Sequence, residues 1–129
     1  MTVDKNMPIL IVDDNKTMLR IVRNLLIQLN LNNIDEATDG KMALDKAREK
    51  SFGLIISDWN MEPMTGLEFL KQLRAGNDPV KSTPFIMVTA ESKTDNIIAA
   101  KQAGVNNYIV KPFSAETLKS KIVSVLGAF

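Results

Sequence analysis

Cysteine and histidine are both absent from this chain of 129 residues. The lack of cysteine excludes disulfides and thiolate metal sites, and it fits a reducing compartment. The lack of histidine excludes a Ser-His-Asp triad, a histidine-ligated zinc ion and a phosphohistidine on this chain. Any reactive or metal-binding site must therefore use other side chains.

Long apolar stretches and a charge excess are also missing. No apolar run approaches the length that a bilayer-spanning helix needs, and the polar segment 1–6 has no signal-peptide core. Lysine plus arginine number 16 and aspartate plus glutamate 15, for a net charge of +1. This balance gives no general attraction to nucleic acid or anionic membrane. We therefore expect a cytoplasmic protein with neither as its partner, folded as one domain over 1–129 with a short N-terminal arm at 1–7.

What is present is an alternation of two patterns. Short apolar runs predict buried strands at 9–12, 34–37, 54–57, 85–89 and 108–110. Segments with helical spacing lie between them: a first helix capped by Asn15, shorter helices at about 41–50, 65–75 and 93–103, and a last helix capped by Ser114. Five strand–helix repeats predict an α/β fold, with a parallel sheet and helices on both of its faces.

Three details of the helices are predicted as well. In the first helix an apolar stripe runs through Met18, Ile21, Val22, Leu25, Leu26 and Leu29. Glycines 53, 76 and 104 follow helix ends, where a left-handed residue is expected. The helix at 93–103 has little apolar volume, so it is either the least firmly anchored helix or an ordinary alanine-rich one.

Polar residues follow the predicted strands at their carboxyl ends. Asp13 and Asp14 close the first strand, Asp58 the third, Thr89 the fourth and Lys111 the fifth. Ligands of parallel sheets bind at this edge. Carboxylates gathered there repel one another without a cation, and oxygen ligands suit Mg²⁺. A hydroxyl and an ammonium group facing the same place favour phosphate as a second guest.

Each of these residues also has a simpler interpretation. Asp13 and Asp14 can be acids at a helix N-terminus, and Asp58 can be a turn residue. Thr89 suits any strand, and a lysine such as Lys111 at a strand end is usually solvated. Their convergence on one edge favours a common site, in which a carboxylate can act as a nucleophile toward phosphorus.

These motifs together resemble the receiver domain of bacterial response regulators. The likeness covers residues 8–126 and rests on Ile-Val-Asp13-Asp14, Ile-Ser-Asp58-Trp59-Asn60-Met61, Met-Val-Thr89-Ala90-Glu91 and Tyr108-Ile-Val-Lys111-Pro112-Phe113. Within the family, the chain is most similar to the single-domain regulators of chemotaxis. The resemblance implies a flavodoxin-like, doubly wound sheet of five strands in the order 2-1-3-4-5 with five helices. It also implies a cis peptide before Pro112.

The resemblance further implies a role for each site residue. Asp58 accepts a phosphoryl group from a phosphohistidine of a partner histidine kinase. Asp14, Asp58 and the backbone carbonyl of Asn60 bind Mg²⁺, while Asp13 acts mainly through bound water. Thr89 and Lys111 hold the phosphoryl oxygens.

The resemblance also implies how the signal leaves the site. Inward movement of Thr89 lets Tyr108 turn inward, which remodels a target face that includes Ile97, Tyr108 and Lys121. Without the resemblance, Tyr108 is equally well read as a half-buried ring with its hydroxyl in water. We expect a monomeric switch that catalyses only its own phosphorylation and dephosphorylation, with a flagellar motor switch protein or another protein as its target.

The loop after Asp58 departs from the family pattern. Glu62 stands where the family commonly has proline, and Thr65 precedes Gly66 where an aspartate is usual. Glu62 either tunes kinase choice or metal affinity, or simply faces solvent. Asn60 and Glu91 flank the reacting group and leave water some access, so we expect an acyl phosphate that lasts seconds to minutes.

Other functions remain open on the same residues. A phosphate sink or relay needs the same site, so motifs alone do not separate it from a switch. A phosphatase or nucleotide enzyme is disfavoured, because no glycine-rich phosphate loop follows the first strand and no second acid stands two residues after Asp58. A degenerate receiver that serves as a scaffold would lack a site residue, and none is missing.

Overall fold

The computed structural model describes residues 4–77, 80–90 and 94–127. Its parallel sheet has the strand order β2-β1-β3-β4-β5. The strands are β1 (Ile9–Val12), β2 (Ile34–Ala37), β3 (Leu54–Asp58), β4 (Phe85–Thr89) and β5 (Asn107–Val110). The helices are α1 (Lys16–Gln28), α2 (Gly40–Glu49), α3 (Gly66–Arg74), α4 (Thr94–Gln102) and α5 (Ala115–Leu126), with a short 3-10 turn at Val80–Ser82. The predicted fold class and strand order are confirmed.

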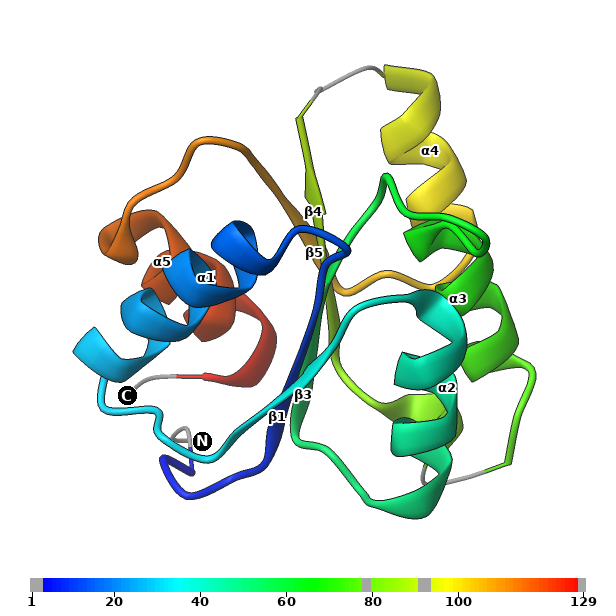
Figure 1. Cartoon of the computed structure of the whole chain (residues 1–129). Helices are drawn as coiled ribbons and strands as arrows, with labels where there is room; N and C mark the ends of the chain where they lie inside the picture. The colour runs from blue at the N-terminus through cyan, green and yellow to red at the C-terminus, as the bar shows by residue number, and fades with distance from the viewer. Residues whose placement is uncertain (1–3, 78–79, 91–93, 128–129) are drawn as a thin grey trace.

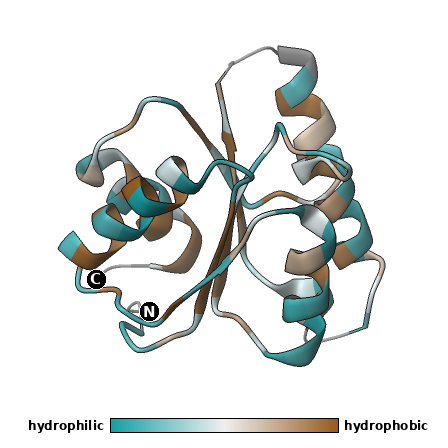
Figure 2. Cartoon of the chain, viewed as in Figure 1, coloured by the Kyte–Doolittle hydropathy of each residue, from teal (hydrophilic) through white to brown (hydrophobic). Residues whose placement is uncertain are grey.

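The helices form a layer on each side of the sheet (Figure 1). Helices α1 and α5 cover one face, and α2, α3 and α4 cover the other. Every residue of β1, β3 and β4 is buried, as expected for central strands that are covered on both faces. Figure 2 shows the apolar residues concentrated along these strands and on the helix sides that face them.

Two apolar clusters hold the layers together. Ile9, Ile11 and Ile56 pack with residues of α1 and α5 on one face. On the other face Leu10 and Phe85 pack with residues of α2 and α3. Alternate residues of the same strands point to opposite faces, so both clusters draw on the same short strands.

Helix α1 begins as predicted and buries most of the predicted stripe. The Asn15 side chain caps it by accepting from the backbone N–H groups of Thr17 and Met18 at 2.9 and 3.2 Å. Leu19, Val22 and Leu26 are its buried residues. The prediction for Ile21 was wrong, because its side chain is 44% exposed. The apolar spacing predicted the buried side of α1 correctly at Val22 and Leu26, but it omitted Leu19 and included Ile21.

The glycine prediction holds at one position of three. Gly104 has a φ of 95° after α4, but Gly53 and Gly76 are not among the positive-φ glycines of the described residues. Gly53 is required for another reason, since a Cβ there would lie 2.8 Å from the sulfur of Met7. Met7 belongs to the buried core, so the last residue of the predicted N-terminal arm packs onto the domain.

Arg74 organises the end of the molecule opposite the predicted site. Its guanidinium donates to the carbonyls of Lys81, Thr83 and Gly104 at 3.0, 2.6 and 3.0 Å, and to Asn106 Oδ1 at 3.0 Å. Burial lowers the pKa of this guanidinium. One side chain thus ties the C-terminus of α3 to the approach to β4 and to the connection between α4 and β5.

The open edge of β2 is covered by side chains from both helix layers. Arg23 of α1 pairs with Glu36 at 2.8 Å and reaches the Ile34 carbonyl at 3.4 Å. Lys46 of α2 donates to the Glu36 carbonyl at 2.8 Å. The carbonyls of Asn33 and Ala37 accept from β1 and its continuation, so those of residues 34 and 36 point away from the sheet.

No helix within the described ranges combines the length and the apolar character needed to cross a bilayer.

Candidate functional site

The carboxyl ends of the strands bring three acids together. Val12 of β1 is paired with Ser57 of β3, so Asp13 and Asp58 follow at neighbouring positions. One carboxylate oxygen from each of Asp13, Asp14 and Asp58 lies within 4.8 Å of the other two. Asp13 and Asp58 are each only 5% exposed, whereas Asp14 is exposed. The cluster therefore consists of two buried acids and one accessible acid, Asp14.

Backbone contacts fix the acids in place. The Asp13 side chain accepts from the N–H of Asn15 at 2.9 Å. Beyond Asp58, the N–H of Trp59 bonds to the carbonyl of Val88, and the N–H of Gly66 bonds to the carbonyl of Trp59, both at 2.9 Å. A Cβ at Gly66 would overlap the carbonyl oxygen of Asp58. The connection from β3 to α3 folds back over Asp58 only because this residue is glycine.

Lys111 provides the single cation against this cluster in the described part of the chain. Its Nζ lies 2.9 Å from Asp58 Oδ1 and 3.5 Å from Asp13 Oδ2. The contact with Asp58 is a close ion pair, and no further donor among the described residues reaches the buried Asp58 Oδ1. Such an oxygen is available to an incoming ligand.

The electrostatics of the cluster favour a cation. Burial raises the pKa of Asp13, and the neighbouring charge of Asp58 adds to this effect. Burial also raises the pKa of Asp58, helped by Asp14 and opposed by Lys111. Burial by itself lowers the pKa of Lys111, but the contacts with Asp58 and Asp13 outweigh it and the pKa is raised. Two buried carboxylates thus share one ammonium group, and the exposed Asp14 adds a further negative charge beside them.

Thr89 and Lys111 are held side by side. Thr89 is buried at the end of β4, and its carbonyl accepts from the N–H of Lys111 at 2.8 Å. The structure therefore brings five of the predicted site residues, Asp13, Asp14, Asp58, Thr89 and Lys111, to one rim of the sheet. The peptide before Pro112 is cis, as the family resemblance implied, and the Glu62–Pro63 peptide is cis as well.

A hollow of about 380 Å³ borders the cluster through Asp14. Asn60, Met61, Glu62 and Thr65 line the rest of it. Asn60, whose carbonyl is the predicted metal ligand, is therefore on the same side as the accessible acid. Glu91, predicted to flank the reacting group, lies outside the described residues.

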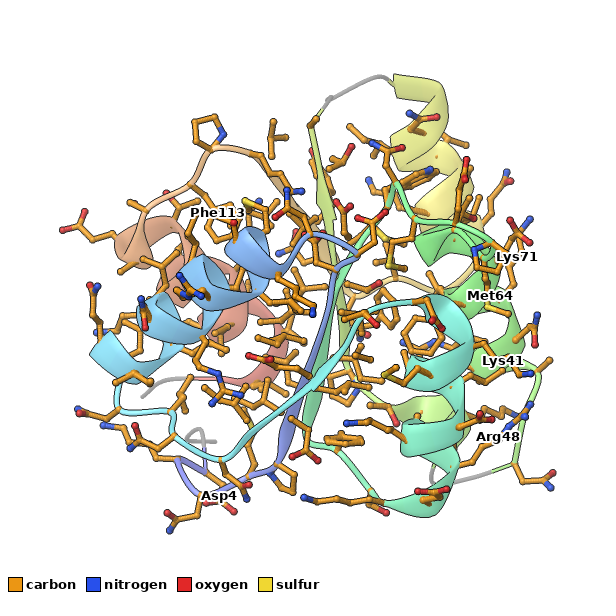
Figure 3. All side chains as sticks on the ribbon, in the orientation of Figure 1. Asp4, Lys41, Arg48, Met64, Lys71 and Phe113 are labelled. Atoms are coloured by element: carbon orange, nitrogen blue, oxygen red, sulfur yellow. The ribbon has the colours of Figure 1, made fainter. Side chains whose placement is uncertain are left out.

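The connections around the site reach both layers. Figure 3 shows Phe113 over the α1–α5 face and Met64 over the face of α2 and α3. Phe113 packs against the first apolar cluster and Met64 against the second. A movement of the β5–α5 connection, which carries Phe113, or of the β3–α3 connection, which carries Met64, would therefore be felt by a helix layer.

The predicted switch and target residues lie on β5, α5 and α4. Tyr108 is half-buried, and the Nζ of Lys121 lies 5.1 Å from the centre of its ring. Ile97 is also half-buried, and its neighbour Ile98 is 47% exposed. The ring of Tyr108 packs against the second apolar cluster, and Ala100 is the buried residue of the described part of α4.

Two features of the site escaped prediction from the sequence. Thr65 and Glu68 form a full capping box at the start of α3, with Glu68 N donating to Thr65 Oγ1 at 3.2 Å. The Thr-x-x-Glu spacing is the usual signal of such a box. The close approach of Gly66 to the backbone of Asp58 has no local signal, because it depends on how the loop returns to the strand.

Comparison with known proteins places this fold and site in one class. Residues 9–123 match the response regulator receiver domain, and the chain belongs to that family. It is 53% identical over 119 residues to the chemotaxis protein CheY-3 of Vibrio cholerae serotype O1, covering 92% of this chain and 91% of that one. Chemotaxis proteins of the CheY type are thus among its relatives.

Solved structures agree with this assignment. The chemotaxis response regulator CheY4 of Vibrio cholerae matches with a TM-score of 0.86 and 36% identity, covering 94% of this chain and 99% of that one. The receiver domain of a sensor histidine kinase from Pseudomonas aeruginosa PAO1, with a magnesium ion in its active-site cleft, matches with a TM-score of 0.85. At 24% identity, over 95% of this chain and 99% of that one, it shares the fold.

Proposed function

We propose that this chain is a phosphorylation-driven binding switch of two-component signalling, and that Asp58 is its phospho-acceptor. The observation that supports this most directly is the buried Asp58 Oδ1. Apart from the Lys111 ammonium, no donor among the described residues reaches this oxygen, and two further carboxylates lie beside it. It therefore keeps a lone pair for attack, as a nucleophile requires.

We propose Mg²⁺ as the resident metal ion. The donor set consists of carboxylate and carbonyl oxygens, which suits a small hard cation that keeps several of its waters. Asp14, Asp58 and the carbonyl of Asn60 would hold the ion, with Asp13 acting through water. The bound ion reduces the repulsion between a carboxylate and an incoming phosphoryl group. The magnesium ion reported for the Pseudomonas receiver domain belongs to that protein, and the argument here rests on the three clustered acids.

Asp58, Lys111 and Thr89 would carry out the transfer of the phosphoryl group. In the proposed step an oxygen of Asp58 attacks phosphorus, a P–O bond forms, and the P–N bond to the donor histidine breaks. Lys111 faces the charge that the transferred oxygens bring, and its ammonium is held there by Asp13 and Asp58. The Thr89 hydroxyl, at the end of the adjacent strand, donates to one phosphoryl oxygen.

A mass measurement tests the acceptor directly. Incubation with Mg²⁺ and a small phosphodonor is expected to add the mass of one phosphoryl group, and a chelator is expected to prevent it. Asp58→Ala is expected to abolish the gain, while Asp45→Ala, which removes an exposed acid of α2, keeps it. Unmodified wild-type protein, or a modified Asp58→Ala variant, would contradict the proposal.

For the output we propose a protein target at the face that carries Ile97, Tyr108 and Lys121. The CheY relatives are chemotaxis proteins, and a flagellar motor switch protein is the target we infer for a monomeric protein of this kind. The chain would then act enzymatically only on its own acyl phosphate. Beryllofluoride-treated protein is expected to retain the motor switch protein in a pull-down, and Tyr108→Ala is expected to weaken this. Retention equal to that of untreated protein would instead favour a phosphate sink or relay.

A further inference from the structure

The connection from β3 to α3 carries an acid that the chemistry above does not use. Glu62 is exposed and lies four residues beyond Asp58. It lines the 380 Å³ hollow together with Asp14 and Asn60. The hollow thus connects Glu62 with Asp14, the accessible acid of the cluster.

The charge of Glu62 is not compensated. Among the described residues it forms neither a hydrogen bond nor an ion pair. The other acid of this region, Glu68, contacts the hydroxyl of Thr65 at 3.1 Å as part of the capping box. The lining of the hollow contains two acids and no base, and Lys111 is engaged with Asp58 and Asp13. A group that approaches the cluster at this side meets a net negative field.

We propose that Glu62 is a specificity-determining residue, which selects phosphodonors by their charge. This inference rests on the proposed function of Asp58. Every donor of a phosphoryl group is an anion, and the penalty from Glu62 grows with the negative charge that the donor carries. A hydrated Mg²⁺ ion experiences the opposite effect, because Glu62 attracts the cation and can accept hydrogen bonds from its waters.

Two small phosphodonors differ in their net charge, as this test requires. Acetyl phosphate is a dianion at neutral pH, and phosphoramidate is a monoanion whose nitrogen is already protonated. In both cases an oxygen of Asp58 forms the new bond to phosphorus. Acetate leaves with the electron pair of the broken P–O bond, and ammonia leaves with that of the broken P–N bond. The transferred group is the same, so a change in their relative rates reports on the approach of the donor.

The experiment compares Glu62→Gln with a matched control. Glu49→Gln removes the same charge from an exposed residue at the C-terminal end of α2. At saturating Mg²⁺ and otherwise low ionic strength, the ratio of the acetyl phosphate rate constant to the phosphoramidate rate constant is expected to rise about 1.5- to 2-fold in Glu62→Gln. This is the partly screened effect of one unit charge at ~10 Å in water. The ratio is expected to stay unchanged in Glu49→Gln, and the gain is expected to disappear at high salt.

A second measurement needs no phosphodonor. Trp59, the single tryptophan of the chain, is adjacent to Asp58, so its fluorescence can report Mg²⁺ binding. The dissociation constant for Mg²⁺ is expected to increase about two- to fourfold in Glu62→Gln, because the cation carries two charges and the single-charge effect is squared. A rate ratio that is the same in Glu62→Gln and Glu49→Gln overturns the inference, even if Mg²⁺ binding weakens. Wild-type protein that takes up no phosphoryl group from either donor overturns the proposed function instead.

Discussion

Removal of the Asp13 charge is expected to stabilise the fold. One oxygen of Asp13 lies within 4.8 Å of one of Asp58, a repulsion of about 3.5 kcal/mol at an effective dielectric constant of ~20. Its 3.5 Å contact with Lys111 offsets this with an attraction of about 5 kcal/mol on the same scale. The attraction exceeds the repulsion by about 1 kcal/mol, but the cost of burying the carboxylate is larger than this difference, and the pKa of Asp13 is raised. A pKa raised by folding means that the ionised carboxylate lowers the stability of the fold at neutral pH.

Asp13→Asn keeps the shape of the side chain, and its Oδ1 can still accept the hydrogen bond from the N–H of Asn15. We expect the free energy of unfolding to rise by about 1–2 kcal/mol, the usual size of the effect of a single substitution, or roughly 4–8 °C in Tm for a chain of this size. Urea unfolding at neutral pH, in the presence of a chelator, measures the difference. Asp45→Asn, on the exposed side of α2, is the matched control and is expected to change little. Added Mg²⁺ is expected to stabilise the wild type more than the variant.

The pH dependence gives this prediction a second test. The pKa of Asp13 is higher in the folded chain than its ordinary value of 3.8, so the folded state binds the proton more tightly. The cost of the ionised carboxylate is therefore present above the raised pKa, is relieved as the pH falls through it, and is gone below 3.8. The advantage of Asp13→Asn should shrink in the same direction. An unchanged or lower stability at neutral pH, or an advantage that grows on acidification, would refute the reasoning.

Three further outcomes are expected, two from the structure and one from the residues that flank the proposed acceptor. Gly66→Ala should lower the free energy of unfolding by about 1–3 kcal/mol or more in urea denaturation, since its Cβ would overlap the carbonyl of Asp58; an unchanged midpoint would contradict this. Arg74→Met should cost about 2–3 kcal/mol, because it leaves three carbonyls without their donor and removes one of the two donors of Asn106 Oδ1. Faster amide hydrogen exchange at 103–106 would accompany that loss, and unaltered exchange would count against it. The acyl phosphate on Asp58 should decay within seconds to minutes, as followed by intact mass, and a lifetime of many hours would argue against the predicted access of water past Asn60.

Most of the fold could be predicted from the sequence, because buried strands and amphipathic helices leave different spacings. The strand bounds differ from those predicted by at most one residue, at Asp58 and Asn107. The errors occur where spacing carries no information about rotation or contact. Ile21 fits the stripe of α1 but lies on its exposed side, and Gly53 is needed by the neighbouring Met7 instead of by a helix end.

The candidate site shows a similar division. The gathering of acids at one rim follows from the parallel topology, since the carboxyl ends of parallel strands share an edge. Which acid is buried does not follow from it. Asp13 and Asp14 are adjacent beyond the end of a strand, where regular alternation stops, and only the path of the loop buries the first and exposes the second. The hollow at Glu62 likewise depends on the return of a loop, which no short-range pattern encodes.

The side chains that cover β2 affect how copies of the protein meet. A strand with unpaired peptide groups is a template for cross-chain pairing and for aggregation. Here a neighbouring chain that aligned with this border would have to displace the guanidinium of Arg23 and the ammonium of Lys46 from the carbonyls they occupy, and it would lose their charge-assisted bonds. The border is thereby protected against intermolecular sheet extension, even though the sheet itself is not closed.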